Sequence, residues 1–399
     1  MKKVLLAYSG GLDTTYCALY LKQECQFEVH LISVDTGSFT ISEKEHLAVM
    51  ANTLGAASFV CKDVSREYYE TCIRYLIYGN VLKHGTYPLS VSAERAVQAI
   101  TVAQYAKELG IDTVAHGSTG AGNDQVRFDM IFRQIYPDIS IITPIRDKQL
   151  SRAEEIEYIR EYGIDFPEEK AAYSINKGLW GTSIGGKETL GSSEYLPENA
   201  WPTPITAYES IDITLAFHEG EFIDINGQSL NDPLKCIREL DAIVQPYGIG
   251  RDIHVGDTII GIKGRVGFEA GAPIIIIKAH HLLEKHVLTK WQLHWKDQLS
   301  GWYGTWLHEG HMLDPVMRDI ESFFSSTQKY VSGKVFIRLY PYRFELLGIE
   351  SQFDLMSNAF GSYGEMNRTW SGDDVKGFAT IFGNQTLIHR TIHAGDNDA

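Results

Sequence analysis

Ala7-Tyr8-Ser9-Gly10-Gly11-Leu12-Asp13-Thr14-Thr15 is the stretch of sequence from which the fold can be worked out. The compact apolar run at 4–8 is typical of a buried strand, and apolar residues at helical spacing follow from Leu12 onwards. A glycine turn between a strand and a helix lets the backbone approach a ligand closely, and the helix start directs N–H groups and a positive dipole outwards. The stretch therefore predicts a cradle for the phosphates of a nucleotide, in which its hydroxyl groups are further donors.

Two familiar phosphate-binding patterns do not fit this loop. It has neither the GxxxxGK[ST] of a Walker P-loop nor the GxGxxG of a dinucleotide-binding turn. SGGxD directly after a first strand instead resembles the loop of the N-type ATP pyrophosphatases (the PP-loop superfamily), which cleave ATP between its α and β phosphates. The alternative is a glycine-rich turn that only caps a helix.

Strands and helices alternate along the first part of the chain, which favours a parallel sheet with helices on both faces. After 4–8, the runs expected as strands are 29–34, 59–64, 113–116 and 141–145. After Trp201 the pattern changes to that of an α+β domain, with a hairpin over 211–226. We therefore expect an α/β protein with domains at 1–165 and 166–370 and a tail at 371–399.

The second part holds two apolar runs that favour strands, 258–263 and 274–278, and a helix is expected over 280–299. Residues 165–201 are rich in Gly, Ser and Lys, and we interpret them as a junction that carries loops over the site. The aromatic residues between 291 and 306 have partly helical spacing, which favours a core or a subunit interface.

Composition and charge exclude several classes of protein. The chain has 399 residues and a formal net charge of -15, so nucleic acid, which needs a basic face, is not an expected partner. The apolar stretch after Met1 is too short for a signal peptide, and no run is long enough for a membrane span. The five cysteines are odd in number and lack a CxxC pair, which favours reduced thiols and a cytoplasmic protein.

A second glycine loop, HGSTGAGNDQVRF at 116–128, follows the expected strand at 113–116. Ligands of an open parallel sheet lie outside the carboxyl ends of its strands, so both glycine loops can face one crevice. Asn123 can cap a helix, Asp124 can accept from an ammonium, and Arg127, one turn further on, can bind a carboxylate. The pair predicts recognition of an amino acid; the alternative is a capped helix with an internal salt bridge.

Together the two loops resemble those of the argininosuccinate synthase family. The likeness continues in further blocks: Tyr87-Pro88-Leu89 with Ser92, Tyr173-Ser174-Ile175 with Leu179-Trp180-Gly181 and Ser183, and Gly248-Ile249-Gly250-Arg251 with Gly261-Ile262-Lys263 and Arg265. The resemblance implies an adenine nucleotide α-hydrolase-like ATP-binding domain, a C-terminal α+β synthetase domain and an oligomerisation tail. It also implies a homotetramer that condenses citrulline with aspartate through a citrullyl-adenylate, with Mg²⁺ accompanying ATP.

The resemblance also assigns residues to each substrate. The ATP positions are Ala7, Tyr8, Ser9, Gly10, Gly11, Leu12, Asp13, Thr14, Thr15 and Gly117. The citrulline positions are Tyr87, Ser92, Asn123, Arg127, Ser174 and Ser183, and the aspartate positions are Thr119, Asn123 and Asp124. Asp124 and Arg127 are expected to carry catalysis, and no protein ligands to a metal are expected. A ureido carbon is a poor electrophile, so adenylation of its oxygen, alignment and charge stabilisation can supply the rate.

Four positions depart from the family pattern: Ala121 for a Lys, Asn176 for an Asp, Gly256 for a Glu and Phe268 for a Tyr. The last two remove a carboxylate that could hold the amino group of citrulline, together with a hydroxyl. Either a neighbour such as Asp257 or Glu269 replaces the carboxylate, or the acceptor differs from citrulline.

Three other functions are alternatives to the one that the family resemblance implies. A tRNA-modifying enzyme of the same superfamily would need a basic surface and, usually, catalytic cysteines, and this chain offers neither. An adenylating enzyme with another ureido or amide acceptor, or a non-catalytic nucleotide-binding homologue, would explain Gly256 and Phe268, although Asp124 and Arg127 argue against the latter. The residues at 308–311, His-Glu-Gly-His, lack the i, i+4 spacing of a zinc motif and are interpreted as a polar helix edge.

Overall fold

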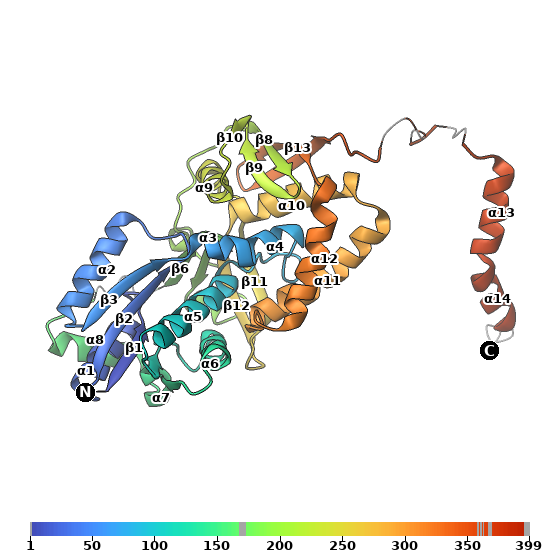
Figure 1. The fold of residues 1–399 in the computed structure, drawn as a ribbon. Coiled ribbons are helices and arrows are strands. Elements are labelled where there is room, and N and C mark those ends of the chain that lie inside the picture. Colours follow the sequence, from blue (N-terminus) through green and yellow to red (C-terminus); the bar gives the residue numbers. More distant parts are fainter. Residues whose placement is uncertain are drawn as a thin grey trace. The chain divides into compact units, whose positions relative to one another are not determined.

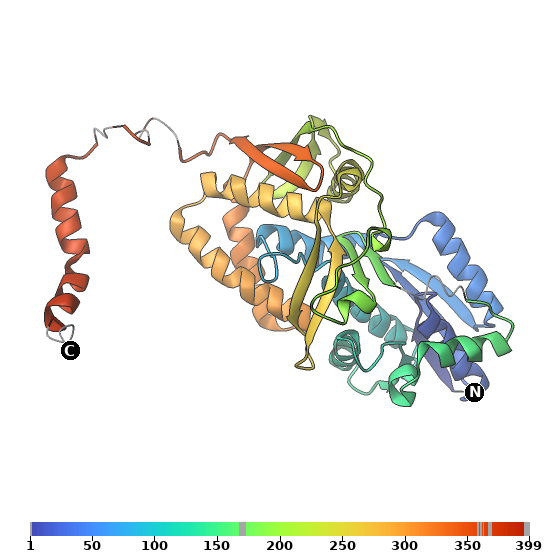
Figure 2. The same cartoon turned by 180° about the vertical axis from the view of Figure 1, so that it is seen from behind.

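The computed structural model describes residues 2–166, 173–356, 359, 361, 363–365 and 369–394. The chain forms two compact units, Met1–Phe353 and Asp354–Ala399. Figures 1 and 2 show the first unit from opposite sides.

A five-stranded parallel sheet with the strand order β3-β2-β1-β4-β5 forms the N-terminal part of the first unit (Figure 1). Its strands are β1 (Lys3–Ala7), β2 (Glu28–Asp35), β3 (Ser58–Asp63), β4 (Thr113–Ala115) and β5 (Ser140–Ile142). Leu6 lies opposite Leu31 of β2 and Ala115 of β4, so β1 is the central strand. The strand expected over 141–145 ends at Ile142, because Pro144 begins a short helix.

Helices cover both faces of this sheet, which confirms the α/β prediction. The helices of this part of the chain are α1 (Leu12–Gln23), α2 (Ile41–Thr53), α3 (Ser65–Tyr68), α4 (Arg74–Tyr78), α5 (Ser90–Glu108), α6 (Asp124–Ile135), α7 (Pro144–Lys148) and α8 (Arg152–Glu161). Leu5 packs in the core that contains α5, whereas Val4 and Leu6 pack in the core that contains α1. Successive residues of β1 thus face opposite layers, as the pleat of a strand requires.

Two antiparallel sheets and four long helices follow, which confirms the α+β prediction for the second part. The sheets have the orders β11-β12-β7-β6 and β10-β9-β8-β13-β14. Their strands are β6 (Ser174–Gly178), β7 (Gly181–Gly185), β8 (Ile211–His218), β9 (Glu221–Ile225), β10 (Gln228–Ser229), β11 (Arg251–Asp257), β12 (Lys263–Glu269), β13 (Gly333–Tyr340) and β14 (Arg343–Glu350). The helices are α9 (Pro233–Val244), α10 (Gly271–Val287), α11 (Lys290–Glu309) and α12 (Pro315–Thr327).

Several predictions for this part are wrong in detail. The run at 274–278 lies in α10, where Pro273 fits the first turn and the isoleucines are largely buried. The run at 258–263 is mostly the turn between β11 and β12. The helix expected over 280–299 is interrupted, because Thr289 forms a capping box that begins α11. The segment 165–201, which was expected to be a junction made of loops, also contains the hairpin formed by β6 and β7.

One hydrophobic core joins the two parts of the first unit. It contains Leu5 and Ile100 from the first part, and Trp180, Ile276 and Ile337 from the second. Helix α5 contacts β1 and β2 of the parallel sheet and also β6 and β7 of the antiparallel sheet. Helix α5 therefore lies between the two sheets. The domain boundaries expected at 165 and 370 stay predictions.

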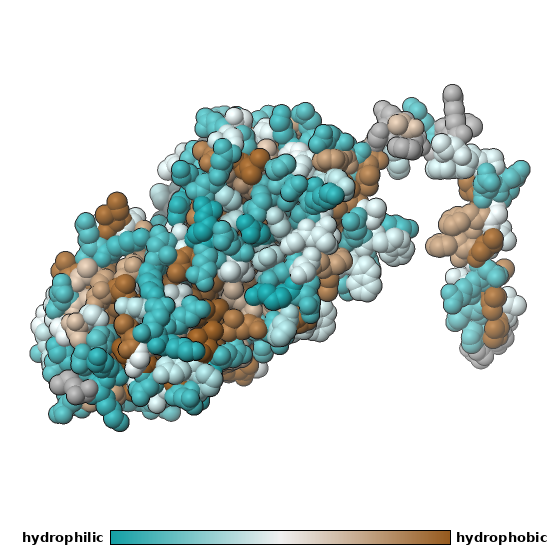
Figure 3. Space-filling view, in the orientation of Figure 1, coloured by the Kyte–Doolittle hydropathy of each residue, from teal (hydrophilic) through white to brown (hydrophobic). Residues whose placement is uncertain are grey.

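The second unit contains α13 (Gly372–Phe382) and α14 (Asn384–Ile392). Both expose apolar side chains, seen as brown areas on this unit in Figure 3: Val375, Phe378, Ile381, Phe382, Leu387, Ile388 and Ile392. Across the whole described chain, no helix combines the length and the apolar character that crossing a bilayer requires.

Candidate active site

The first glycine loop joins β1 to α1. Gly10 has a φ of +74°, and a Cβ there would lie 2.5 Å from the side chain of Leu47. Thr14 Oγ1 accepts from the backbone N–H of Ser9 at 3.3 Å, and Ser9 Oγ accepts from that of Gly11 at 3.3 Å. Among the described side chains none caps α1. The first N–H groups of the helix are therefore left for an anion.

The second glycine loop touches the first. A Cβ on Gly117 would lie 3.1 Å from Asp13 Cβ and 3.2 Å from Thr14 Cγ2. The contact arises because β1 and β4 are parallel neighbours, so both loops leave the sheet at its carboxyl edge. The structure thus brings the two glycine loops into one place.

Asn123 ties the second loop to the second part of the chain. It stands at the N-cap of α6, but its side chain makes no capping hydrogen bond. Its Oδ1 instead accepts from the backbone N–H of Ile259, in the turn between β11 and β12, at 2.8 Å. Gln125 closes the loop from inside, because its Nε2 donates to the carbonyls of Gly120 at 2.7 Å and Gly122 at 3.1 Å.

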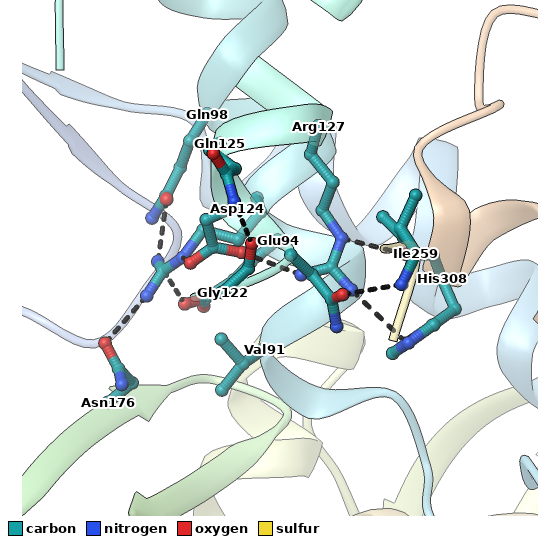
Figure 4. A network of polar contacts seen from close by, with 12 residues as sticks. Val91, Glu94, Gln98, Gly122, Asp124, Gln125, Arg127, Asn176, Ile259 and His308 are labelled. Atoms are coloured by element: carbon teal, nitrogen blue, oxygen red, sulfur yellow. Dashed lines mark hydrogen bonds and ion pairs between the residues drawn. The ribbon is translucent and has the colours of Figure 1, made fainter. Parts of the chain in front are cut away.

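Asp124 lies between two arginines (Figure 4). Its Oδ1 accepts from Arg127 Nη1 at 2.7 Å, and its Oδ2 accepts from Arg95 Nε at 3.1 Å. Burial raises the pKa of the Asp124 carboxyl, but the two guanidinium charges and their hydrogen bonds outweigh burial and lower it. The carboxylate is therefore ionised. The side chains of Asp124 and Arg127 form the internal salt bridge that was the alternative to recognition of an amino acid.

His308 of α11 orients Arg127. Arg127 Nε donates to the backbone carbonyl of His308 at 2.8 Å, and Nη2 lies 3.3 Å from His308 Nδ1. Burial and the charge of Arg127 lower the pKa of His308 to about 2, so the imidazole is neutral and Nδ1 accepts. The interpretation of residues 308–311 as a polar helix edge is wrong for His308, which is buried. Three of the five guanidinium N–H groups are bonded to described residues, and among these residues the other two have no partner, so they are available to a ligand.

The sequence interpretation missed Arg95 and Glu94. Arg95 Nη1 donates to Glu94 Oε1 at 3.0 Å and to Gln98 Oε1 at 2.8 Å, and Nη2 donates to Asn176 Oδ1 at 2.7 Å. Glu94 Oε2 accepts from the hydroxyl of Thr36, at the carboxyl end of β2, at 3.0 Å. Burial raises the pKa of Glu94 to about 7. The sequence signal for this pair was two adjacent charges near the start of a mostly apolar helix.

The expected citrulline positions are only partly brought together. Ser183 lies between Asn176 and Phe268 in the sheet register. Phe268 packs on Tyr87, whose ring centroid is 5.3 Å away. Ser92 is buried, and among the described residues its hydroxyl has no partner.

Two other expected positions lie on the surface. Thr119 and Ser174 are exposed, and no hydrogen bond joins either hydroxyl to another described residue. Ala121 is exposed as well, so the second loop presents no charge there.

The two acids considered as replacements for the missing carboxylate are both paired. Asp257 Oδ1 lies 2.5 Å from Lys263 Nζ on the surface, and Glu269 Oε2 lies 2.9 Å from Arg251 Nε in a buried pair. Neither carboxylate is therefore left without a cation.

The parallel sheet, the two touching glycine loops and the charged side chains beside them define a nucleotide-binding α/β protein with an adjoining substrate domain. Two family models match the chain: the argininosuccinate synthase N-terminal HUP domain over residues 3–165, and the argininosuccinate synthase C-terminal domain over residues 173–389. The chain belongs to the argininosuccinate synthase family, as its sequence resemblance predicted.

Similar proteins cover nearly the whole chain. The argininosuccinate synthase of Dictyoglomus thermophilum is 36% identical over 399 residues, which span 100% of this chain and 99% of the relative. That of Sulfolobus acidocaldarius is 34% identical over 97% of this chain and 98% of its own. That of Methanocaldococcus jannaschii is 35% identical over 96% of this chain and 97% of its own.

Proposed function

We propose that this chain is a carbon–nitrogen ligase that condenses citrulline with aspartate at the expense of ATP. The contact between the two glycine loops, at Gly117 and Asp13, carries this proposal, because a nucleotide bound at the first loop would then lie near the Asp124–Arg127 pair that follows the second. The ureido oxygen attacks the α-phosphorus and pyrophosphate leaves. The aspartate amine then attacks the activated carbon, AMP leaves, and argininosuccinate forms.

In the proposed reaction, backbone groups bind the triphosphate and side chains bind the two amino acids. Backbone N–H groups of the first loop and Gly117 bind the triphosphate. The two remaining N–H groups of Arg127 bind the acceptor carboxylate, and Asn123 and Asp124, with Thr119, receive the aspartate. Because no side chain has to exchange a proton in the adenylation step, alignment and charge stabilisation supply the rate.

Mg²⁺ accompanies ATP in the proposed reaction. Among the described residues, no three His, Cys, Asp or Glu side chains group together as a metal site. Glu155 of α8 is buried, however, with one carboxylate oxygen that has no partner among the described residues, and burial and Asp13 raise its pKa to about 8. Mg²⁺ bound to nucleotide needs only one or two carboxylates besides phosphate and water oxygens. Asp13 and Glu155 would hold the ion, which would neutralise charge on the departing pyrophosphate.

The proposal includes a homotetramer and a cytoplasmic location. Trp291, Trp295 and Trp302 of α11 are exposed rather than part of the core, and such apolar surface supports a subunit interface. The exposed apolar faces of α13 and α14 also support contacts between subunits. All five cysteines are free thiols, which supports a reducing compartment.

ATP–pyrophosphate exchange tests the proposed function. We expect exchange that requires a citrulline-type ureido acceptor, followed by AMP release when aspartate is added. A protein that binds ATP but gives no exchange with any ureido or amide compound would be a non-catalytic homologue, and the proposal would be wrong.

A further inference from the structure

Positive charge gathers at the acceptor end of the site, around Arg127. The charges of Lys83 and Arg127 both lower the pKa of His308, and Arg127 also lowers that of Lys83, whose pKa falls mainly through burial. Burial, followed by His84 and Lys83, lowers the pKa of His254 to about 4. Two cations and two neutral imidazoles therefore share this space.

Two of the carboxylates in this space, Asp124 and Asp257, are already bonded to cations. Both oxygens of Asp124 are bonded to arginines, and Asp257 is paired with Lys263. Glu309 and Asp257 raise the pKa of Lys83, but among the described residues no carboxylate forms an ion pair with its ammonium. A free α-ammonium in this space would meet two cations, and burying a charge without a partner is costly.

Three aromatic rings, those of Tyr87, His254 and His84, form a stack next to Lys83. The ring of Tyr87 stacks on His254 at 4.9 Å, and His254 stacks on His84 at 5.7 Å. The missing side chain of Gly256 makes room for this stack, because a Cβ there would lie 2.6 Å from His254 Nε2. A longer acidic side chain at 256 could not coexist with the present position of His254.

A cavity of about 210 Å³ begins at the same segment. Lys83 and His84 line one side of it, and Gly304 and Thr305 of α11 line the other. It has room for a substituent of a few heavy atoms, and Lys83 can donate hydrogen bonds at its edge.

We propose that this site takes a ureido amino acid whose α-amino group is acylated, in preference to free citrulline. Acylation removes the ammonium that two cations would repel, provides a carbonyl oxygen that accepts from Lys83, and directs the acyl chain to the cavity. The inference rests on the proposed adenylation, whose bonds are unchanged: the ureido oxygen displaces pyrophosphate, and the aspartate amine then displaces AMP. The product is an Nα-acylated argininosuccinate.

The test compares three acceptors on the full-length chain with ATP, Mg²⁺ and aspartate: citrulline, Nα-acetylcitrulline and Nα-succinylcitrulline, whose terminal carboxylate adds an anion for Lys83. We expect kcat/KM for at least one acylated acceptor to exceed that for citrulline about 10-fold or more. A kcat/KM that is higher for citrulline than for both acylated compounds overturns the inference and leaves the proposed function intact. No pyrophosphate exchange with any of the three refutes both.

Lys83→Met supplies a second measurement. We expect the ratio of kcat/KM for the better acylated acceptor to kcat/KM for citrulline to fall about 10-fold. Lys235→Met, at an exposed position of α9, is the matched control and should keep the ratio. Titration with ATP confirms that both variants are folded. An unchanged ratio in folded Lys83→Met contradicts the proposed contact with the acyl group.

Discussion

The nucleotide end and the acceptor end of this site are built in different ways. The nucleotide end consists of backbone from two loops on neighbouring strands, whose glycines bring Gly117 against Asp13. The acceptor end consists of side chains from α5, α6, β6 and α11 and of Thr36 after β2, and hydrogen bonds link them from Thr36 through Asp124 to His308. A backbone site depends on local conformation, whereas a side-chain site can change its charges, and with them its ligand, within the same fold.

The largest effect is expected for Arg127→Ala, at the centre of the acceptor end. Turnover should fall about 10²–10³-fold, because the change removes a cation directed at substrate and leaves Asp124 with one arginine. ATP binding, measured by titration, should stay within about twofold if the two ends are independent. Arg133→Ala, on the exposed side of α6, is the control and should leave turnover unchanged. A similar loss of ATP affinity in Arg127→Ala would show that the two ends act as one.

A smaller loss is expected when Glu94 is removed. Glu94→Ala should lower kcat up to about 100-fold, because Arg95 loses its second carboxylate and Asp124 loses its fixed position. Asn176 also accepts from Arg95, so Glu94→Ala combined with Asn176→Asp returns a carboxylate to the same guanidinium. We expect the double variant to recover most of the lost rate. Equal rates in the single and double variants would contradict a role for this charge.

The pH profile separates the charge of Glu94 from its shape. Its pKa is raised to about 7 by burial, so the carboxylate is protonated below that pH and attracts Arg95 less. We expect kcat of the unmodified chain to rise with pH through about 7, and Glu94→Gln to lose this step. A step that persists in Glu94→Gln belongs to another group.

The nucleotide end should respond to an added methyl group. Gly117→Ala would place a Cβ 3.1 Å from Asp13 Cβ, so the two loops must move apart, and we expect about 10-fold weaker ATP binding. Gly122→Ala is the control in the same loop, since nothing described lies within 4 Å of its Cβ position. Isothermal titration with ATP measures both. Equal affinities would mean that the contact of the loops is not part of the nucleotide site.

The smallest effect is expected for Asp257→Asn. Its pair with Lys263 is solvent-exposed, so KM for the acceptor should change less than about twofold. A 10-fold rise in KM for citrulline, with no rise for an acylated acceptor, would identify Asp257 as the partner of an ammonium.

The difference between the nucleotide end and the acceptor end also explains which parts of the site could be predicted from the sequence. The first loop was recognisable because its strand, glycines and helix lie within a few residues of one another. Arg95, Asn176 and His308 are far apart in the sequence, and only the folded chain brings them around Asp124 and Arg127. The sequence indicated Asp124 and Arg127 but not the residues that surround them.

The error at 274–278 has a physical cause. Isoleucine favours strands because its branched Cβ fits a pleated surface, so a run of four predicts one. Burial on several sides of a helix suits the same residues, and α10 lies in the core that joins both parts of the first unit. Tertiary packing therefore outweighed local preference.

The core that crosses position 165 has a consequence during synthesis. When the parallel sheet has left the ribosome, the face that carries Leu5 still lacks Trp180 and Ile276, and Ile337 emerges last of the three. A nascent chain that stops near residue 165 exposes apolar surface meant for these partners and should attract chaperones or aggregate. The nucleotide-binding half therefore reaches its final stability only after most of the polypeptide has been translated.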